Sequence, residues 1–324
     1  MSKIALVTGT LGQDAPYLAK LLLDKGYKVY GLVRRYSNPN FSNLDYVGVT
    51  KKIDFVEGDL SDESSLYNIV RSIRPDEIYN LGAQSFVRSS FDQPKLTTEV
   101  NGLAVLYFLN AIKMFSPTTR FYQASTSEMF GSSNDGGYQD ENTVFHPRSP
   151  YGVAKLYAHW MGINYRESYG LFVCNGILFN HESPIRGMQF VTRKVAHGAA
   201  QIKKGLVDHI SMGNLDAVRD WGFAGDYVEA MHLMLQQDKP DDYVVATGEA
   251  HTVKEMVQVA FEHVGISDWE KHIKIDPAHM RPAEVPFLLG RPTKAMEKLG
   301  WKPKTNFKTL ITMMVDAELK RLEK

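Results

Sequence analysis

The chain has 324 residues, 44% of them hydrophobic, and can bury a large core as one large or two closely joined domains. Lysine plus arginine and aspartate plus glutamate both number 37, so a net charge of zero argues against nucleic acid or an anionic membrane as partner. Cys174, the single cysteine, lies in an apolar run and favours a reduced core thiol in the cytoplasm. We see neither a leader sequence nor an apolar run long enough to span a bilayer.

Short β-rich runs alternate with helical stretches along the first half of the chain. The predicted strands are residues 4–7, 28–33, 53–56, 77–81, 120–124 and 171–178. This alternation predicts an α/β fold, a doubly wound Rossmann-like parallel sheet with helices on both faces. After Asn180 the pattern becomes less regular and richer in proline, which suits a smaller α+β domain over the carboxyl edge of the sheet.

A glycine-containing turn follows the first predicted strand and opens a helix. Glycines let the backbone approach a pyrophosphate at a helix N-terminus, where free amides and the helix dipole favour anions. Ala15 stands where a third glycine is common, and an ordinary strand-to-helix turn is the alternative, but the place at the start of a βαβ array favours a dinucleotide site. The expected contacts are Gly9, Thr10, Leu11, Gly12, Gln13 and Asp14.

Arg34, Arg35 and Ser37 follow the second predicted strand. An acidic residue here would hold a ribose diol, whereas arginine and serine donors suit a 2′-phosphate. NADP is therefore favoured over NAD. A solvated basic loop or a subunit contact is the alternative.

Two further loops are expected to border the dinucleotide. Asp59 and Leu60 would flank the adenine, although helix capping by Ser61 or Asp62 also explains this turn. Small residues after the fourth strand fit a close approach to the diphosphate and the nicotinamide ribose, with a tight turn as the alternative. They are Leu81, Gly82, Ala83, Gln84 and Ser85.

Four residues of matching chemistry converge after the fifth strand: Thr126 and Glu128, then Tyr151 and Lys155 on the next helix. Residues four apart on a helix point the same way, so the ammonium is expected to lower the pKa of the phenol and make it a proton acceptor, as in dehydrogenases. Alone, Glu128 would read as a surface carboxylate and Tyr151 as a core aromatic. Beside Tyr151 and Lys155, Glu128 suits the removal of a proton from a carbon that a newly formed ketone has made acidic. The set predicts oxidation, elimination and reduction.

The motifs at 8–14, 81–85, 125–128 and 151–155 resemble the extended short-chain dehydrogenase/reductase family. Within it, six motifs resemble the GDP-mannose 4,6-dehydratases in particular. These are the Thr-Gly-x-x-Gly-Gln-Asp turn at 8–14, Arg34-Arg35, Gly82-Ala83-Gln84-Ser85, Asn180-His181-Glu182-Ser183-Pro184, Arg219-Asp220-Trp221 and Arg281-Pro282-Ala283-Glu284-Val285. The resemblance implies a lyase that converts GDP-mannose to GDP-4-keto-6-deoxymannose with bound NADP.

The resemblance also implies a role for each catalytic residue. Tyr151, acidified by Lys155, would take the C4 hydroxyl proton as hydride leaves C4 for NADP⁺, and Thr126 would orient that oxygen. Glu128 would remove the C5 proton, the 6-hydroxyl would leave as water, and hydride would return to C6. The cofactor would end as it began.

The nucleotide-sugar site is placed by the same resemblance. Lys194, Arg219 and Arg281 would meet the diphosphate charge, each with a surface cation as its alternative. Glu284 would bind guanine or ribose, or instead pair with Arg281. The remaining expected contacts are Asn180 and Ser85 for the substrate, and Val100, His181 and Arg186 for NADP. The ten histidines show no metal-ligand spacing.

We expect a dinucleotide-binding domain of residues 1–180 and 214–247, interleaved with a nucleotide-sugar domain of 181–213 and 248–324. Family members pair through helices, so a homodimer or homotetramer is expected, with the stretches 94–115 and 149–169 as candidate interfaces. The same apolar stripes could instead face the sheet.

Three alternative functions remain at this point. A 4-keto-6-deoxy sugar-nucleotide reductase would keep Tyr151 and Lys155 but has no use for Glu128. A GDP-manno-heptose dehydratase would use the same chemistry with a roomier sugar pocket. A non-catalytic nucleotide-binding regulator is the third, because fold does not dictate function.

Overall fold

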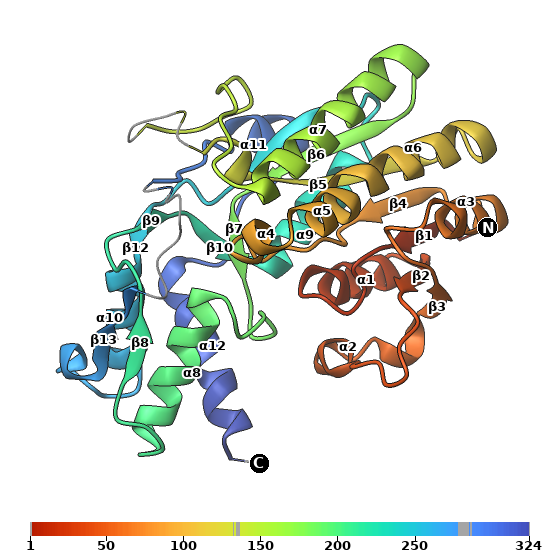
Figure 1. Ribbon diagram of the computed structural model, residues 1–324. Coiled ribbons are helices and arrows are strands. Elements are labelled where there is room, and N and C mark those ends of the chain that lie inside the picture. The colour runs from red at the N-terminus through yellow and green to blue at the C-terminus, as the bar shows by residue number, and fades with distance from the viewer. Residues whose placement is uncertain (1, 132, 134–136, 278–284, 286, 324) are drawn as a thin grey trace.

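The computed structural model describes residues 2–131, 133, 137–277, 285 and 287–323. Within these residues, seven strands form one parallel sheet in the order β11-β6-β5-β4-β1-β2-β3 (Figure 1). The strands are β1 (Ile4–Val7), β2 (Lys28–Val33), β3 (Asp54–Glu57), β4 (Glu77–Asn80), β5 (Arg120–Thr126), β6 (Val173–Leu178) and β11 (Asp242–Val245). The order reverses between β1 and β4, the topology of a dinucleotide-binding sheet. The predicted α/β fold is confirmed.

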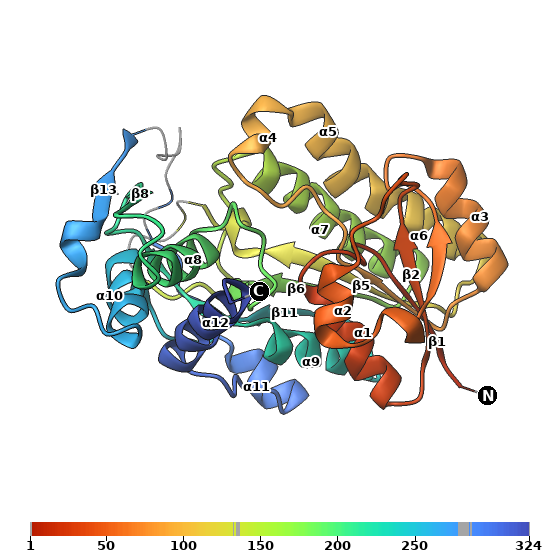
Figure 2. The same ribbon diagram turned by 90° about the horizontal axis from the view of Figure 1, so that it is seen from below.

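Helices cover both faces of the sheet (Figure 2). One face is covered by α3 (Glu63–Ile73), α6 (Ala104–Phe115) and α7 (Pro150–Tyr169), whose apolar residues form a core with Leu6, Ile78 and Phe121. The other face is covered by α1 (Asp14–Asp24), α9 (Ala224–Met234) and α11 (Thr293–Leu299). Burial of these faces is the main stabilising contribution to the fold.

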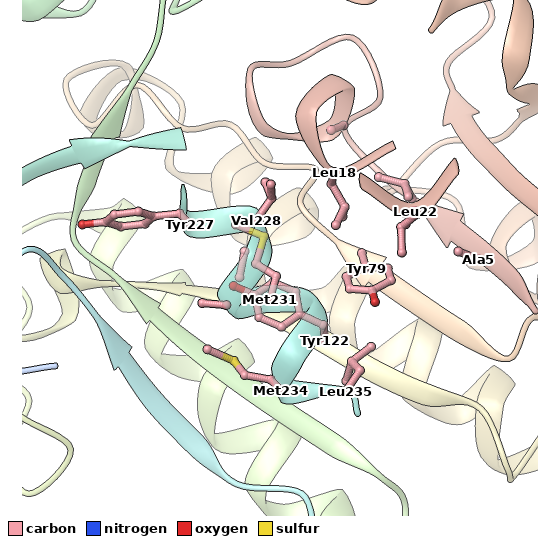
Figure 3. Close-up of a cluster of buried hydrophobic side chains, with 14 of the residues drawn as sticks. Ala5, Leu18, Leu22, Tyr79, Tyr122, Tyr227, Val228, Met231, Met234 and Leu235 are labelled. Carbon is pink, nitrogen blue, oxygen red and sulfur yellow. The ribbon is translucent and has the colours of Figure 1, made fainter. Parts of the chain in front are cut away.

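The second core brings three distant parts of the chain together (Figure 3). Leu18 and Leu22 of α1 and Met231 of α9 lie over Tyr79 and Tyr122 of the central strands, all buried. The apolar face of α1 follows helical spacing, so its burial follows directly from the sequence. This packing fixes the glycine turn that precedes α1 against the carboxyl edge of the sheet.

A second group of elements lies beyond that edge. Its core gathers α8 (Val191–Lys203), α10 (Val253–His263) and α12 (Phe307–Arg321) around Trp221 and Trp269. Three short strand pairs lie in or beside this group: β7 (Asn180–Glu182) with β10 (Trp221–Phe223), β9 (Val218–Arg219) with β12 (His251–Thr252), and β8 (Ile210–Met212) with β13 (Ile273–Ile275). Ala295, Leu299 and Trp301 belong to the core of α1 instead. The domain boundaries stay a prediction.

The shorter helices occur in the connections. They are α2 (Ser42–Val47), α4 (Ser89–Asp92), α5 (Pro94–Thr98) and the 3₁₀ segments Thr50–Lys52, Ser127–Met129 and Trp269–His272. The stretch 94–115 is not one α-helix, because a π-helical turn at Glu99–Leu103 separates α5 from α6. Such turns often occur at functional sites.

Predicted strand boundaries differ from the structure by one or two residues, as fraying ends allow. The first two strands match, and β5 continues to Thr126, two residues further than expected. Among the described residues, none of the helices is both long and apolar enough to cross a bilayer.

Candidate active site

One cavity of about 700 Å³ lies at the carboxyl ends of the sheet strands. It is lined by the glycine turn, the loops after β3 and β4, the ends of β5 and β6, and part of α8. The predicted site residues that line it are Gly9, Thr10, Leu11, Gly12, Gln13, Asp14, Arg34, Asp59, Leu60, Leu81, Gly82, Ala83, Gln84, Ser85, Val100, Thr126, Glu128, Tyr151, Lys155, Asn180, His181, Arg186, Lys194 and Arg219. Residues from distant parts of the chain therefore share one site.

Two backbone loops approach each other closely at the floor of this cavity. Gly9 has a φ of +67°, and a Cβ there would lie 2.8 Å from the amide nitrogen of Gly82. The Thr8 hydroxyl accepts a hydrogen bond from that same amide at 2.8 Å. Only glycine satisfies both the dihedral and the space, so the turn is built for close backbone approach.

Asp14, at the start of α1, forms an ion pair across the cavity floor. Its carboxylate lies 3.0 Å from His181 Nε2, while His181 Nδ1 lies 2.8 Å from the carbonyl of Phe179. Burial disfavours the imidazolium, but the Asp14 charge and both hydrogen bonds outweigh it and raise the pKa of His181. The Gln13 amide donates to the His181 carbonyl at 3.0 Å. Gln13 and Asp14 thus join the glycine turn to β7.

The carboxyl end of β5 presents Thr126 and Glu128. Thr126 caps the short 3₁₀ segment after the strand, because its hydroxyl accepts from the Glu128 amide at 3.3 Å. Both side chains are at least nine-tenths buried. The cap fixes the backbone at Glu128, whose side chain lines the cavity.

Helix α7 begins beside this strand end. Ser149 caps it by accepting from the Gly152 amide at 3.0 Å, and Pro150 stands in the first turn. A Cβ on Gly152 would lie 2.9 Å from the Glu128 carbonyl oxygen, so glycine permits the close approach. The sequence therefore places Tyr151 next to Thr126 and Glu128 by capping and by close packing.

The predicted lowering of the Tyr151 pKa is wrong for this structure. Burial raises the pKa of Tyr151 to about 12; a hydrogen bond with Thr126 opposes that rise, and the Glu128 charge adds to it. Lys155 Nζ donates to the Ala124 carbonyl at 2.9 Å and lies 6.0 Å from the centre of the Tyr151 ring. Burial also lowers the pKa of Lys155 to about 8. Desolvation of the phenol therefore outweighs the groups that favour its ionised form.

The loop with Arg34, Arg35 and Ser37 lies in different surroundings from those expected for a phosphate site. Arg34, Arg35 and Ser37 are all exposed, and Arg34 donates to the Tyr36 hydroxyl. Arg34 and Arg35 line a separate cavity of about 410 Å³, whose lining does not include Ser37. Glu57, Asp59 and Asp62 share that lining, so three carboxylates lie beside the two arginines. The carboxylates come from β3 and the start of α3, which the sheet order brings beside β2.

The loop after β3 satisfies its own polar groups. The Asp59 carboxylate accepts from the Ser61 amide at 2.9 Å, and Asp62 caps α3 by accepting from the Ser64 amide at 3.1 Å. Helix capping, the alternative explanation of this turn, is therefore confirmed for Asp62. Asp59 and Leu60 still line the main cavity.

Two of the predicted cations, Lys194 and Arg219, line the main cavity. Arg219 is almost fully buried and donates to the carbonyl of Val218 at 2.8 Å. Burial lowers the pKa of Lys194. Arg281 and Glu284 lie outside the described residues.

A sequence model of the family described as "GDP-mannose 4,6 dehydratase" matches residues 6–314. The chain belongs to this family. "GDP-mannose 4,6 dehydratase 1" of Arabidopsis thaliana is 53% identical over 98% of this chain and 90% of its own length. The Homo sapiens "GDP-mannose 4,6 dehydratase" is 47% identical over 98% and 91%. A solved structure, a Thermus thermophilus UDP-glucose 4-epimerase in complex with NAD, has a TM-score of 0.83 at 28% identity, covering 97% of this chain and 98% of that one.

Sequence reasoning missed several residues that line or support the site of this dehydratase-family chain. Asn101, in the π-helical turn, accepts from the Gln84 amide at 2.8 Å and donates to the Gln84 carbonyl at 2.9 Å. Phe86 and Phe190 line the cavity with their rings edge to face, 6.0 Å apart. A buried asparagine next to a glycine in an apolar helix could have indicated Asn101. The Phe pair carries no local signal, since it joins two loops far apart in the sequence.

The site fits a dinucleotide. Gly12 exposes backbone at the start of α1, where amides and the helix dipole favour a pyrophosphate. Gln84 Oε1 is buried without a hydrogen-bond partner among the described residues, and its side chain lines the cavity. A buried acceptor without a donor is costly, so a ligand donor would stabilise it. Within the same residues, no cluster of three or more His, Cys, Asp or Glu side chains could hold a metal ion.

Proposed function

We propose that this chain converts GDP-mannose to GDP-4-keto-6-deoxymannose with a bound nicotinamide dinucleotide. One observation carries the proposal: Thr126, Glu128, Tyr151 and Lys155 line the same cavity as Asn180, Lys194 and Arg219. The first group can move protons, and the second can bind a nucleotide diphosphate. The names of the relatives support the same substrate.

Tyr151 would act as the base at the C4 hydroxyl of the sugar. Its hydrogen bond with Thr126 places both hydroxyl groups at one point of the cavity. A sugar hydroxyl bound there would donate to the phenol oxygen while Thr126 orients it. Because burial raises the pKa of Tyr151 to about 12, the phenol of the unliganded protein stays protonated at neutral pH. Its role as a base therefore requires that bound ligands bring positive charge near the phenol oxygen or let Lys155 approach it.

Glu128 would act as the base at C5 and then as the acid at the departing 6-hydroxyl. Its side chain is nine-tenths buried and its charge acts on Tyr151, so the two groups face the same small volume. A ketone at C4 would acidify the C5 proton enough for a carboxylate to remove it. A reductase would not need this carboxylate, so its burial at the reacting point favours the dehydratase.

The dinucleotide would be held by the glycine turn, the loop 81–85 and the segment around His181 and Arg186. When bound, its nicotinamide would accept hydride from C4 and later supply it to C6. Ser85 and Asn180 would contact the sugar nucleotide.

NADP is the proposed form of the dinucleotide. Arg34 and Arg35 lie together beside the second cavity, next to the main one, and arginine suits a phosphate. Glu57 and Asp59 in that lining favour NAD as the second candidate, because a carboxylate binds a ribose diol. Binding of each cofactor, measured by fluorescence titration, decides between them.

A homodimer or homotetramer is also proposed. Val153, Tyr157 and Trp160 are exposed apolar residues on one side of α7, with Leu96 and Met114 exposed on the neighbouring helices α5 and α6. Exposed apolar side chains on three adjoining helices favour a protein partner. Light scattering that shows a monomer at micromolar concentration would contradict this. A cytoplasmic location is part of the same proposal and rests on the buried free thiol of Cys174.

The deciding experiment is a product assay in deuterated water. Purified chain is incubated with NADP and GDP-mannose, with GDP-manno-heptose and UDP-glucose in parallel, and products are identified by mass. We expect loss of water from GDP-mannose and one solvent deuterium at C5. Turnover of GDP-manno-heptose without turnover of GDP-mannose would identify the heptose nucleotide as the substrate. No product from any sugar, with cofactor bound, would favour the regulator.

A further inference from the structure

A buried carboxylate on the last helix organises several cations near the cofactor end of the cavity. Glu318 of α12 is 1% exposed. Its Oε1 accepts from Arg193 Nε at 2.9 Å and from Arg321 Nη1, and its Oε2 lies 2.8 Å from His197 Nδ1. Helices α8 and α12 lie side by side (Figures 1 and 2), and their apolar residues already form a core. The apolar residues already hold the two helices together, so the ion cluster of Glu318, Arg193, Arg321 and His197 is not needed to join them.

The two arginines reach past Glu318 to the backbone of the segment that follows β7. Arg193 Nη1 donates to the Arg186 carbonyl at 2.5 Å, and Arg321 Nη2 donates to the Pro184 carbonyl at 2.6 Å. The Arg186 side chain lies 3.0 Å from Glu182 Oε2 and stacks over the ring of Phe190. This segment is thus held through its main chain from one side and through its side chain from the other.

Arg321 also contacts α2, the helix that supports the glycine turn. Its guanidinium lies over the ring of Tyr46 in α2, 5.8 Å from the ring centre. In the same helix, Asn43 donates to the carbonyls of Leu11 and Gly12 at 3.0 and 3.1 Å. One side chain on α12 therefore joins the 184–186 segment to the helix that supports the glycine turn.

We propose that Glu318 is a positioning residue that retains the nicotinamide dinucleotide by holding Arg193 and Arg321 in place. A buried carboxylate is costly unless it is paired and hydrogen-bonded, and these pairs satisfy it while directing both guanidinium groups at backbone carbonyls. Three arginines, at 186, 193 and 321, stand against two glutamates, at 182 and 318, so the cluster keeps an excess of positive charge beside a site for phosphates. The inference rests on the proposed function.

The first test replaces Glu318 with Gln, which keeps the shape and removes the charge. Dissociation constants for NADPH and NADH are measured by nicotinamide fluorescence, and stability by calorimetry. We expect cofactor affinity to fall roughly tenfold, the scale of one lost charged hydrogen bond, while kcat at saturating cofactor changes less than twofold. The control is Asp316→Asn, nearby on α12, whose carboxylate pairs with His263 at the surface. It should leave affinity unchanged.

The second test separates positioning from stability alone. If Glu318 acts through Arg186, then Glu318→Gln should add little to the affinity loss of Arg186→Gln, whereas independent effects would add. Arg321→Met removes a partly exposed partner and should reproduce the affinity loss if Glu318→Gln fails to fold, and Arg321→Lys should restore part of it.

Two outcomes overturn the inference. Cofactor affinities within twofold in Glu318→Gln and Arg321→Met, beside a lowered melting temperature, would reduce the cluster to a stabilising role and leave the proposed function intact. An unaltered chain that binds neither NADPH nor NADH would overturn both the role of Glu318 and the proposed function.

Discussion

The catalytic end and the arginine-loop end of the cavity are built in opposite ways. Thr126, Glu128, Tyr151 and Lys155 are all at least nine-tenths buried, and a strand end, a capped 3₁₀ turn and a capped helix hold them. Arg34, Arg35 and Ser37 are exposed, and the polar contact of Arg34 is with its neighbour Tyr36.

The difference shows what a short motif can predict. Where backbone capping and close packing hold the side chains, their spacing in the sequence also decides their arrangement in space. Where the residues lie in an exposed loop, their surroundings come from other strands, as with Glu57 and Asp59. The four predictions below test this contrast, from the largest expected effect to the smallest.

Tyr151→Phe should have the largest effect. Loss of the base for the first oxidation should lower turnover of GDP-mannose by roughly 10²–10⁴ and leave little reduced cofactor at any time. Turnover and absorbance of the reduced nicotinamide are measured together. Tyr169→Phe is the control, because Tyr169 is exposed at the far end of the same helix. A Tyr151→Phe enzyme with normal turnover would remove this residue from the mechanism.

Glu128→Gln should stop the reaction later. The C4 oxidation remains possible, so reduced cofactor and 4-ketose should accumulate on the enzyme while dehydration falls by about 10²-fold or more. Rapid-quench mass analysis in deuterated water follows both. Normal deuterium incorporation at C5 with normal dehydration would show that another residue is the base.

Arg35→Asp should act only on cofactor choice. Loss of a charged donor, with a fourth carboxylate added beside Glu57, Asp59 and Asp62, should shift the ratio of NADP to NAD affinity toward NAD by about 10–100-fold. The matched control is Arg71→Asp on α3, whose guanidinium donates to the Asn68 side chain at the surface. Equal affinity for the two cofactors in the unaltered chain would refute the NADP proposal and favour the carboxylates as ribose ligands.

The pH dependence of stability should report the burial of Lys155. Its pKa falls to about 8 from an ordinary 10.5, so the unfolded chain binds more protons between these values, and stability rises with pH in that window. Between pH 7 and 9 the free energy of unfolding should rise by roughly 1 kcal/mol relative to Lys155→Met. Urea unfolding without cofactor measures the difference. A constant difference would mean that the ammonium is not desolvated.

Much of the fold and the catalytic end could be predicted because the signals are local. The six predicted strands all exist, Ser149 and Pro150 mark the start of α7, and the four catalytic candidates share one cavity. The pKa of Tyr151 could not be predicted, since it depends on desolvation and on the distance from Lys155, which the one-turn spacing does not determine. Arg281 and Glu284 stay predictions.

The sequence by itself determined the order of elements, the turn that suits a pyrophosphate and the chemical groups available for catalysis, because strand alternation, helix caps and glycine dihedrals act over a few residues. Only the tertiary structure decided which charges meet. Asp14 pairs with His181 across 167 positions, Glu318 with Arg193 across 125, and Glu57 comes beside Arg35 through the pairing of β3 with β2. Such contacts are set by sheet order and helix packing, and no local pattern carries them.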